Sequence, residues 1–259
     1  MSFIEWLYSS YPNPHVDGQY GLLHILTMLF IVAFIVVSSI LLRNKSDKTK
    51  RIVLFVLVSI ILILGVTRRI VNLCKTTDYT VNNILSILLP RPGCAISCWL
   101  VIAATIINKK FFYNFSSIIA ILCGVIFFAY PEAGFNNQYL LFENIYSIFT
   151  HTLFLISGVC FITYGFTDFK YKNAWKELIC LGVLLVYVLL EIYVLKIEGD
   201  PFYFMPQNDV QDIVGLGYGI YLPGYLAFIA VYLNAYYLIP FFKNKISNKS
   251  SNKKKTKKA

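Results

Sequence analysis

The chain alternates long apolar stretches with short polar links. Seven of the stretches approach or reach the roughly 20 residues that an α-helix needs to span a bilayer. They lie near residues 21–42, 52–74, 81–107, 111–130, 139–166, 176–196 and 213–241. The pattern therefore predicts an all-α, polytopic membrane protein with seven transmembrane helices.

Polar segments flank the predicted transmembrane helices at both ends of the chain. Residues 1–20 contain Glu5 and Asp17 but no lysine or arginine, so they lack the basic region of a cleavable signal peptide. We expect 1–20 to be an interfacial segment and 21–242 to be the transmembrane domain. We expect 243–259 to be a disordered, lysine-rich cytoplasmic tail.

The distribution of basic residues predicts the orientation. Of the 23 lysines and arginines, 18 fall in alternate links and in the C-terminal tail. Because cytoplasmic segments carry the excess of basic residues, the N-terminus is expected outside and the C-terminus in the cytoplasm.

The third apolar segment is interrupted by Pro90, Pro92 and Gly93. Two prolines and a glycine do not continue a helix, so we predict a segment broken at Pro90–Gly93, with a new helix from Cys94. Such a break inside a membrane is tolerated where it is buried in protein or lines a cavity. A helix start and nearby Arg91 would favour a thiolate at Cys94. The alternative is an ordinary extracellular loop followed by a short span.

The fifth apolar segment carries two ionisable residues. Glu143, Ser147 and His151 are spaced by four, so they share one face of a helix. Ionisable groups within a membrane mark functional sites by default. The alternative is a neutral histidine that bonds a neighbouring helix.

Five spans place a polar or reactive residue at a similar depth. Helical rise puts these residues roughly 20 to 27 Å above the cytoplasmic ends of their spans, and they are His24, Arg68, Cys94, His151 and Glu191. We predict a polar chamber toward the outer leaflet, and side chains separated by more than one helix diameter would contradict it. The substrate-binding candidates are Arg68, Arg69, Arg91, His24, Glu143 and Glu191, because guanidinium groups bind phosphate and carboxylate oxygens well.

Composition narrows the function classes. The net charge of +10 is concentrated in the tail and the cytoplasmic links, so we expect no nucleic-acid partner. The tail either contacts anionic phospholipid headgroups or only fixes the topology. Six cysteines lie mostly in apolar spans, and we expect no disulfide scaffold, no metal site and no cofactor. Phosphate-binding glycine loops and the HExxH and GxSxG motifs are absent from the sequence.

Several short motifs carry a family resemblance. They are YGLLHILTMLF around His24, the Leu-Pro-x-x-x-Cys stretch Leu89–Cys94, the segment Gly124–Pro131, SIFTHTLF around His151 and the late Pro-Gly-Tyr of residues 223–225. Together they resemble the YwaF-like bacterial integral membrane proteins. That family has eukaryotic relatives that include a phospholipid-remodelling membrane acyltransferase. In the family the third segment reads Leu-Pro-x-His-x-Cys, and Pro92 stands here at the histidine position.

The resemblance implies His24, Cys94 and His151 as site residues. A lipid acyltransferase would use Cys94 as nucleophile, His151 as general base and Arg68 or Arg69 to hold the lipid phosphate. The alternatives are a transporter or binding protein for an anionic small molecule or lipid, and a structural membrane protein. We expect membrane lipids as partners and the plasma membrane of a bacterium as the location. The substrate and the oligomeric state stay open.

Overall fold

The computed structural model describes residues 3–8, 20–91, 93–129, 135, 140–197, 206 and 209–256, with side chains described as far as residue 238 in the last helix. All regular secondary structure in these residues is helical, as predicted. The chain divides into two compact units, residues 1–167 and 168–259.

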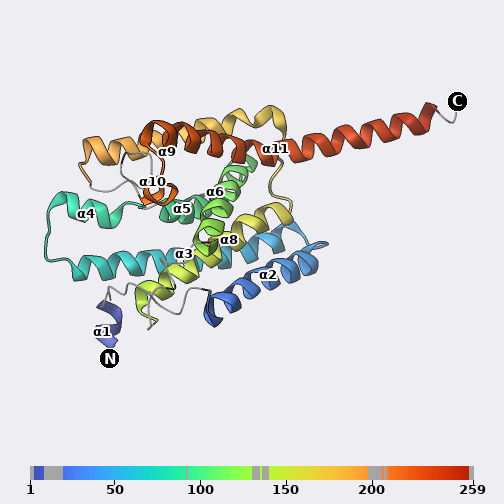
Figure 1. Ribbon diagram of the computed structural model, residues 1–259. Helices are drawn as coiled ribbons and strands as arrows, with labels where there is room; N and C mark the ends of the chain where they lie inside the picture. The colour runs from blue at the N-terminus through green and yellow to red at the C-terminus, as the bar shows by residue number, and fades with distance from the viewer. Residues whose placement is uncertain are drawn as a thin grey trace. The chain divides into compact units, whose positions relative to one another are not determined.

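The first unit contains helices α1 to α8 (Figure 1). Its helices are α1 (Phe3–Tyr8), α2 (Leu22–Leu42), α3 (Asp47–Lys75), α4 (Val81–Leu88), α5 (Gly93–Ile107), α6 (Lys110–Ala129) and α8 (Phe142–Thr163). Ser46 caps α3 by accepting from the Thr49 N–H, and Thr80 caps α4 by accepting from the Asn83 N–H.

The second unit contains η1 (Tyr171–Asn173), α9 (Trp175–Leu189), the π-turn η2 (Leu190–Val194), α10 (Asp209–Val214) and α11 (Tyr218–Thr256). Glu177 on α9 is buried and accepts a hydrogen bond from the Tyr237 hydroxyl on α11. Helix α11 continues into 243–256, where we expected a disordered tail. Lysine is a good helix former, so a helix that has already begun can continue through this stretch.

The membrane spans agree with the sequence pattern. Six described helices are long and apolar enough to cross a bilayer, and α4 with α5 form a seventh span if they count as one. These two helices are bent by 56°, which confirms the broken third segment. Pro92 itself lies outside the described residues. The orientation of the spans stays a prediction.

Helix α8 occupies the centre of the first unit. It contacts α2, α3, α5 and α6. Of the 18 consecutive residues that make up its most apolar stretch, 72% are buried, whereas the corresponding share for α2 is 6%. Two glycines bring α6 and α8 together. A Cβ at Gly124 would lie 2.7 Å from the Leu155 Cβ, and one at Gly158 would lie 3.0 Å from the Ala120 Cβ. Small residues allow this close approach between membrane helices.

Candidate functional site

His151 lies on α8, with 8% of its surface exposed. Its Nδ1 atom is 2.7 Å from the Ser147 carbonyl oxygen, one turn earlier. A carbonyl only accepts hydrogen bonds, so Nδ1 carries the proton of the neutral ring and Nε2 has the free electron pair. The imidazole also stacks on the Phe127 ring of α6, with centroids 3.6 Å apart and planes 13° apart. Both contacts fix the direction of the ring.

Cys94 is the second residue of α5 and is half-buried. Its thiol lies beside the Cys123 thiol of α6. The Ser97 side chain, whose hydroxyl donates to the Gly93 carbonyl at 3.1 Å, also lies close to Cys123, as does the buried Cys98. The start of α5 thus places its thiol against α6, on which α5 packs.

Helix α6 brings the two predicted catalytic residues into one region. Cys123 contacts Cys94, and Phe127, one turn later, stacks on His151. One helical turn rises about 5.4 Å, so the thiol and the imidazole lie against neighbouring turns of the same helix. A thiol that comes within hydrogen-bond reach of a histidine with a free Nε2 can support nucleophilic catalysis.

Arg68 and Glu143 form an ion pair between α3 and α8. The Arg68 Nε donates to Glu143 Oε2 at 2.8 Å, and the guanidinium lies 4.8 Å from the centre of the Tyr146 ring. We expected Glu143 on the same face as His151, and the structure gives it Arg68 as a partner. The Arg68 side chain is 32% exposed, and this bond leaves its two terminal nitrogens for other acceptors.

Arg69 joins α3 to both sides of the break. Its Nε donates to the Leu88 carbonyl at 2.9 Å, and a terminal nitrogen donates to the Gly65 carbonyl at 3.1 Å. The guanidinium also lies 5.3 Å from the Trp99 ring of α5. Arg69 therefore fixes α4 against α5, and its expected role in substrate binding stays a prediction. Arg91 lies two residues before the start of α5, and its N–H donates to the Leu89 carbonyl.

His24 is buried among aromatic rings near the end of α6. The centroids of Tyr20, Phe128 and Phe135 lie 5.3, 6.0 and 4.8 Å from that of His24. Phe128 follows Phe127 on α6, so His24 and His151 contact adjacent residues of one helix. This is consistent with the prediction that His24 and His151 lie at a similar depth in the membrane. Glu191 is buried in the second unit, and its place in the predicted layer stays a prediction.

The sequence did not identify the α6 side of the site. Cys123 and Phe127 lie in a span without acids, bases or histidines, so nothing marked them as more than lipid-facing or core residues. The one available signal was the thiol of Cys123 in the apolar second half of this helix.

Comparison with known proteins gives one match. The sequence model of the TMEM164 family matches residues 19–244, which include every predicted site residue and all the described spans from α2 to α9. Searches of curated proteins and of solved structures give no match.

Proposed function

The chain belongs to the TMEM164 family, and from the geometry of its own site we propose that it is a membrane-embedded lipid acyltransferase with Cys94 as nucleophile and His151 as general base. The multi-pass architecture and the family provide the frame for this proposal. The resemblance of its motifs to YwaF-like proteins, with their acyltransferase relatives, supports the reaction class.

The observation that carries the proposal is the hydrogen bond from His151 Nδ1 to the Ser147 carbonyl. It gives the imidazole the tautomer whose Nε2 can accept a proton. The Cys94 thiol, which lies against the neighbouring turn of α6, is a proton donor of the right kind, and the dry surroundings would strengthen the electrostatic interactions of the charged pair that forms.

Two steps would transfer the acyl group. His151 Nε2 takes the Cys94 proton while the sulfur attacks the ester carbonyl of the donor lipid, and the lysolipid oxygen leaves with that proton. The hydroxyl of an acceptor lysolipid then loses its proton to His151 and attacks the thioester. This attack forms the new ester and returns the proton to Cys94.

The surroundings suit a phospholipid substrate. The exposed part of the Arg68 guanidinium can bind a phosphate oxygen while Glu143 holds the side chain in place. Pro92 replaces the histidine of the family-like Leu-Pro-x-His-x-Cys stretch, so His151 is the base that we propose for both steps.

The test is acyl exchange by the purified protein in liposomes of mixed acyl-chain phospholipids, followed by lipid mass spectrometry. We expect Cys94→Ala and His151→Gln to lower exchange by about 100-fold or more, in the range of lost general base catalysis. Cys180→Ala, in the second unit, is the matched control and should retain exchange. Exchange that survives Cys94→Ala would overturn the proposal.

Transport or binding of an anionic small molecule or lipid is the second candidate. It is favoured by Arg68, which is about one-third exposed and lies beside a broken span, because such breaks line substrate sites in transporters. A lipid or solute that co-purifies with the wild type and is lost in Arg68→Gln, without any acyl exchange, would favour this candidate.

For the location we propose the plasma membrane of a bacterium. The lysine, asparagine, isoleucine and phenylalanine bias resembles an AT-rich bacterial genome. Fractionation of the native cells, with immunoblotting of the chain, tests this assignment.

A further inference from the structure

A cavity lies at the other ends of the helices that carry the candidate site. It has a volume of about 540 Å³ and is formed by the start of α3, the link between α5 and α6, and the end of α8. Its lining residues, which we call the basic pocket, are Asp47, Lys48, Arg51, Ile52, Phe55, Asn108, Lys110, Tyr113, Gly165 and Phe166. Helix α5 separates Cys94 from this pocket by about 20 Å of helical rise.

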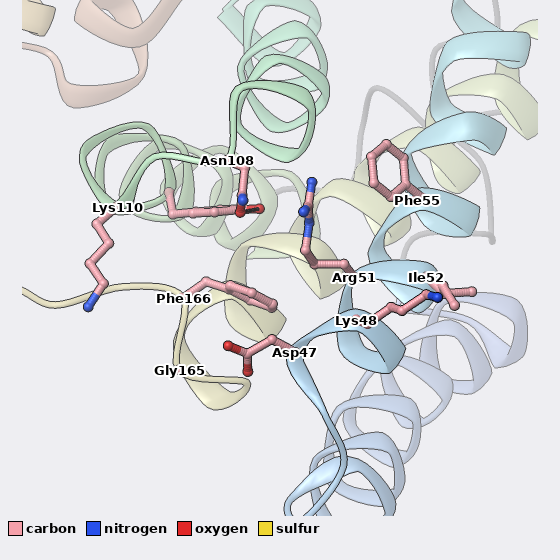
Figure 2. A pocket seen from close by; sticks show the side chains of 10 residues that line it. Asp47, Lys48, Arg51, Ile52, Phe55, Asn108, Lys110, Gly165 and Phe166 are labelled. Carbon is pink, nitrogen blue, oxygen red and sulfur yellow. Dashed lines mark hydrogen bonds between the residues drawn. The ribbon is translucent and has the colours of Figure 1, made fainter.

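Arg51 is the central side chain of the basic pocket. Figure 2 shows its guanidinium extending into the middle of the cavity, between Asn108 and Phe55. It lies near the Tyr113 hydroxyl, which donates to the Asn108 side-chain oxygen at 3.1 Å. The guanidinium also lies 5.6 Å from the centre of the Phe55 ring. These contacts hold Arg51 in one direction before any ligand arrives.

No acid in the described part of the chain neutralises the charge of Arg51. Among the described residues no carboxylate lies within ion-pair distance of it, and its Nε is shielded from solvent without an acceptor. Lys48 and Lys110 lie at opposite edges of the cavity (Figure 2), and Asp47 is the single acidic residue of the lining. The pocket is therefore suited to an anion that supplies acceptors to Arg51.

The turns around the cavity are fixed by backbone conformation. Asn108 ends α5 with φ at +54°, a left-handed conformation that asparagine tolerates. Gly165 ends α8 with φ at +85°, and the Phe166 N–H donates to the Phe161 carbonyl at 3.0 Å. This is a glycine-capped helix end, so the pocket is largely preformed.

We propose that the basic pocket binds a phosphate group. A guanidinium flanked by two lysines matches phosphate oxygens in charge and hydrogen bonding. The aromatic and aliphatic lining, which comprises Ile52, Phe55 and Phe166, contacts the carbon part of the same ligand. The phosphate belongs either to a lipid headgroup at the membrane surface or to a soluble phosphoester. The site is independent of the acyltransferase proposal, because it shares no residue with it.

The test is a titration of the detergent-solubilised full chain with dioctanoyl phosphatidic acid, measured by native mass spectrometry, in parallel with glycerol 3-phosphate. We expect Arg51→Gln to weaken phosphatidic acid binding by about tenfold or more, the loss of charge-assisted hydrogen bonds. Arg43→Gln is the matched control, because Arg43 is an exposed arginine close in sequence that does not line the pocket. It should change binding by less than twofold.

The two sources of phosphate give different results. Glycerol 3-phosphate that competes with phosphatidic acid at equal concentration indicates a soluble phosphoester, and failure to compete indicates a lipid headgroup. Equal effects of Arg51→Gln and Arg43→Gln, or no effect of Arg51→Gln, would overturn the proposal. If Arg51→Gln does not fold, the pair Lys48→Gln with Lys110→Gln is compared with Arg43→Gln and Lys45→Gln, and equal binding then overturns it.

Discussion

The His151 imidazole lies parallel to the Phe127 ring at 3.6 Å, and this stack joins α8 to α6 at the centre of the candidate site. Its closeness depends on Gly124, three residues before Phe127. A Cβ at position 124 would lie 2.7 Å from the Leu155 Cβ, which is closer than real side chains allow. Any larger residue there must push α6 and α8 apart, and with them Cys123 and His151.

We therefore predict that Gly124→Val disrupts the site. Overpacking in a tight contact costs about 1–3 kcal/mol, and a shifted imidazole should reduce acyl exchange by more than tenfold. Thermal unfolding in detergent and lipid mass spectrometry measure the two effects. Gly182→Val is the control, because a Cβ at Gly182 meets nothing within 4 Å. Equal behaviour of the two variants would contradict the prediction.

Cys94 could be predicted as a site residue from the sequence, whereas Cys123 could not. The Pro90 and Gly93 break and the helix that begins beside Cys94 follow from local chemistry, and the spans follow from apolar length. Cys123 became part of the site only through the packing of α6 on α5 and α8. The sequence of an apolar stretch does not indicate which helices will pack against it. For the same reason Glu143 could be placed on the His151 face, but its Arg68 partner could not be found.

The Arg68 and Glu143 pair should show measurable coupling. Both side chains are about one-third exposed, at 32% and 29%, so solvent screens part of their attraction. A double-mutant cycle with Arg68→Gln and Glu143→Gln should give a coupling free energy of about 0.5–1 kcal/mol in chemical unfolding. Additive effects of the two substitutions would show that the ion pair contributes nothing to stability.

Weakening the hydrogen bonds that Arg69 makes to the Leu88 and Gly65 carbonyls should expose the start of α5. Lysine at this position cannot bond the Leu88 and Gly65 carbonyls together, so we expect Arg69→Lys to let α4 and α5 separate more often. In a background with Cys74→Ser and Cys180→Ser, the maleimide labelling of Cys94 should accelerate several-fold. Arg43→Lys, on an exposed link, should leave the labelling rate unchanged. A labelling rate for Arg69→Lys that equals the rate of this control would contradict the prediction that Arg69 holds α4 against α5.

In the second unit, the Tyr237 hydroxyl donates to Glu177, and 1% of each residue is exposed. Because water cannot reach the carboxyl group, removing this donor costs about 1–3 kcal/mol. We predict that Tyr237→Phe lowers the unfolding free energy by this amount, with faster hydrogen exchange along α9 and α11. Tyr232→Phe is the matched control, since its bond to the Tyr236 hydroxyl is part-buried and water can replace it. It should cost less than about 0.5 kcal/mol. If the two variants lose the same stability, then the buried carboxyl does not depend on Tyr237.

Adding Glu177→Gln to Tyr237→Phe should recover part of the loss, because a neutral amide is less costly to bury than a carboxylate.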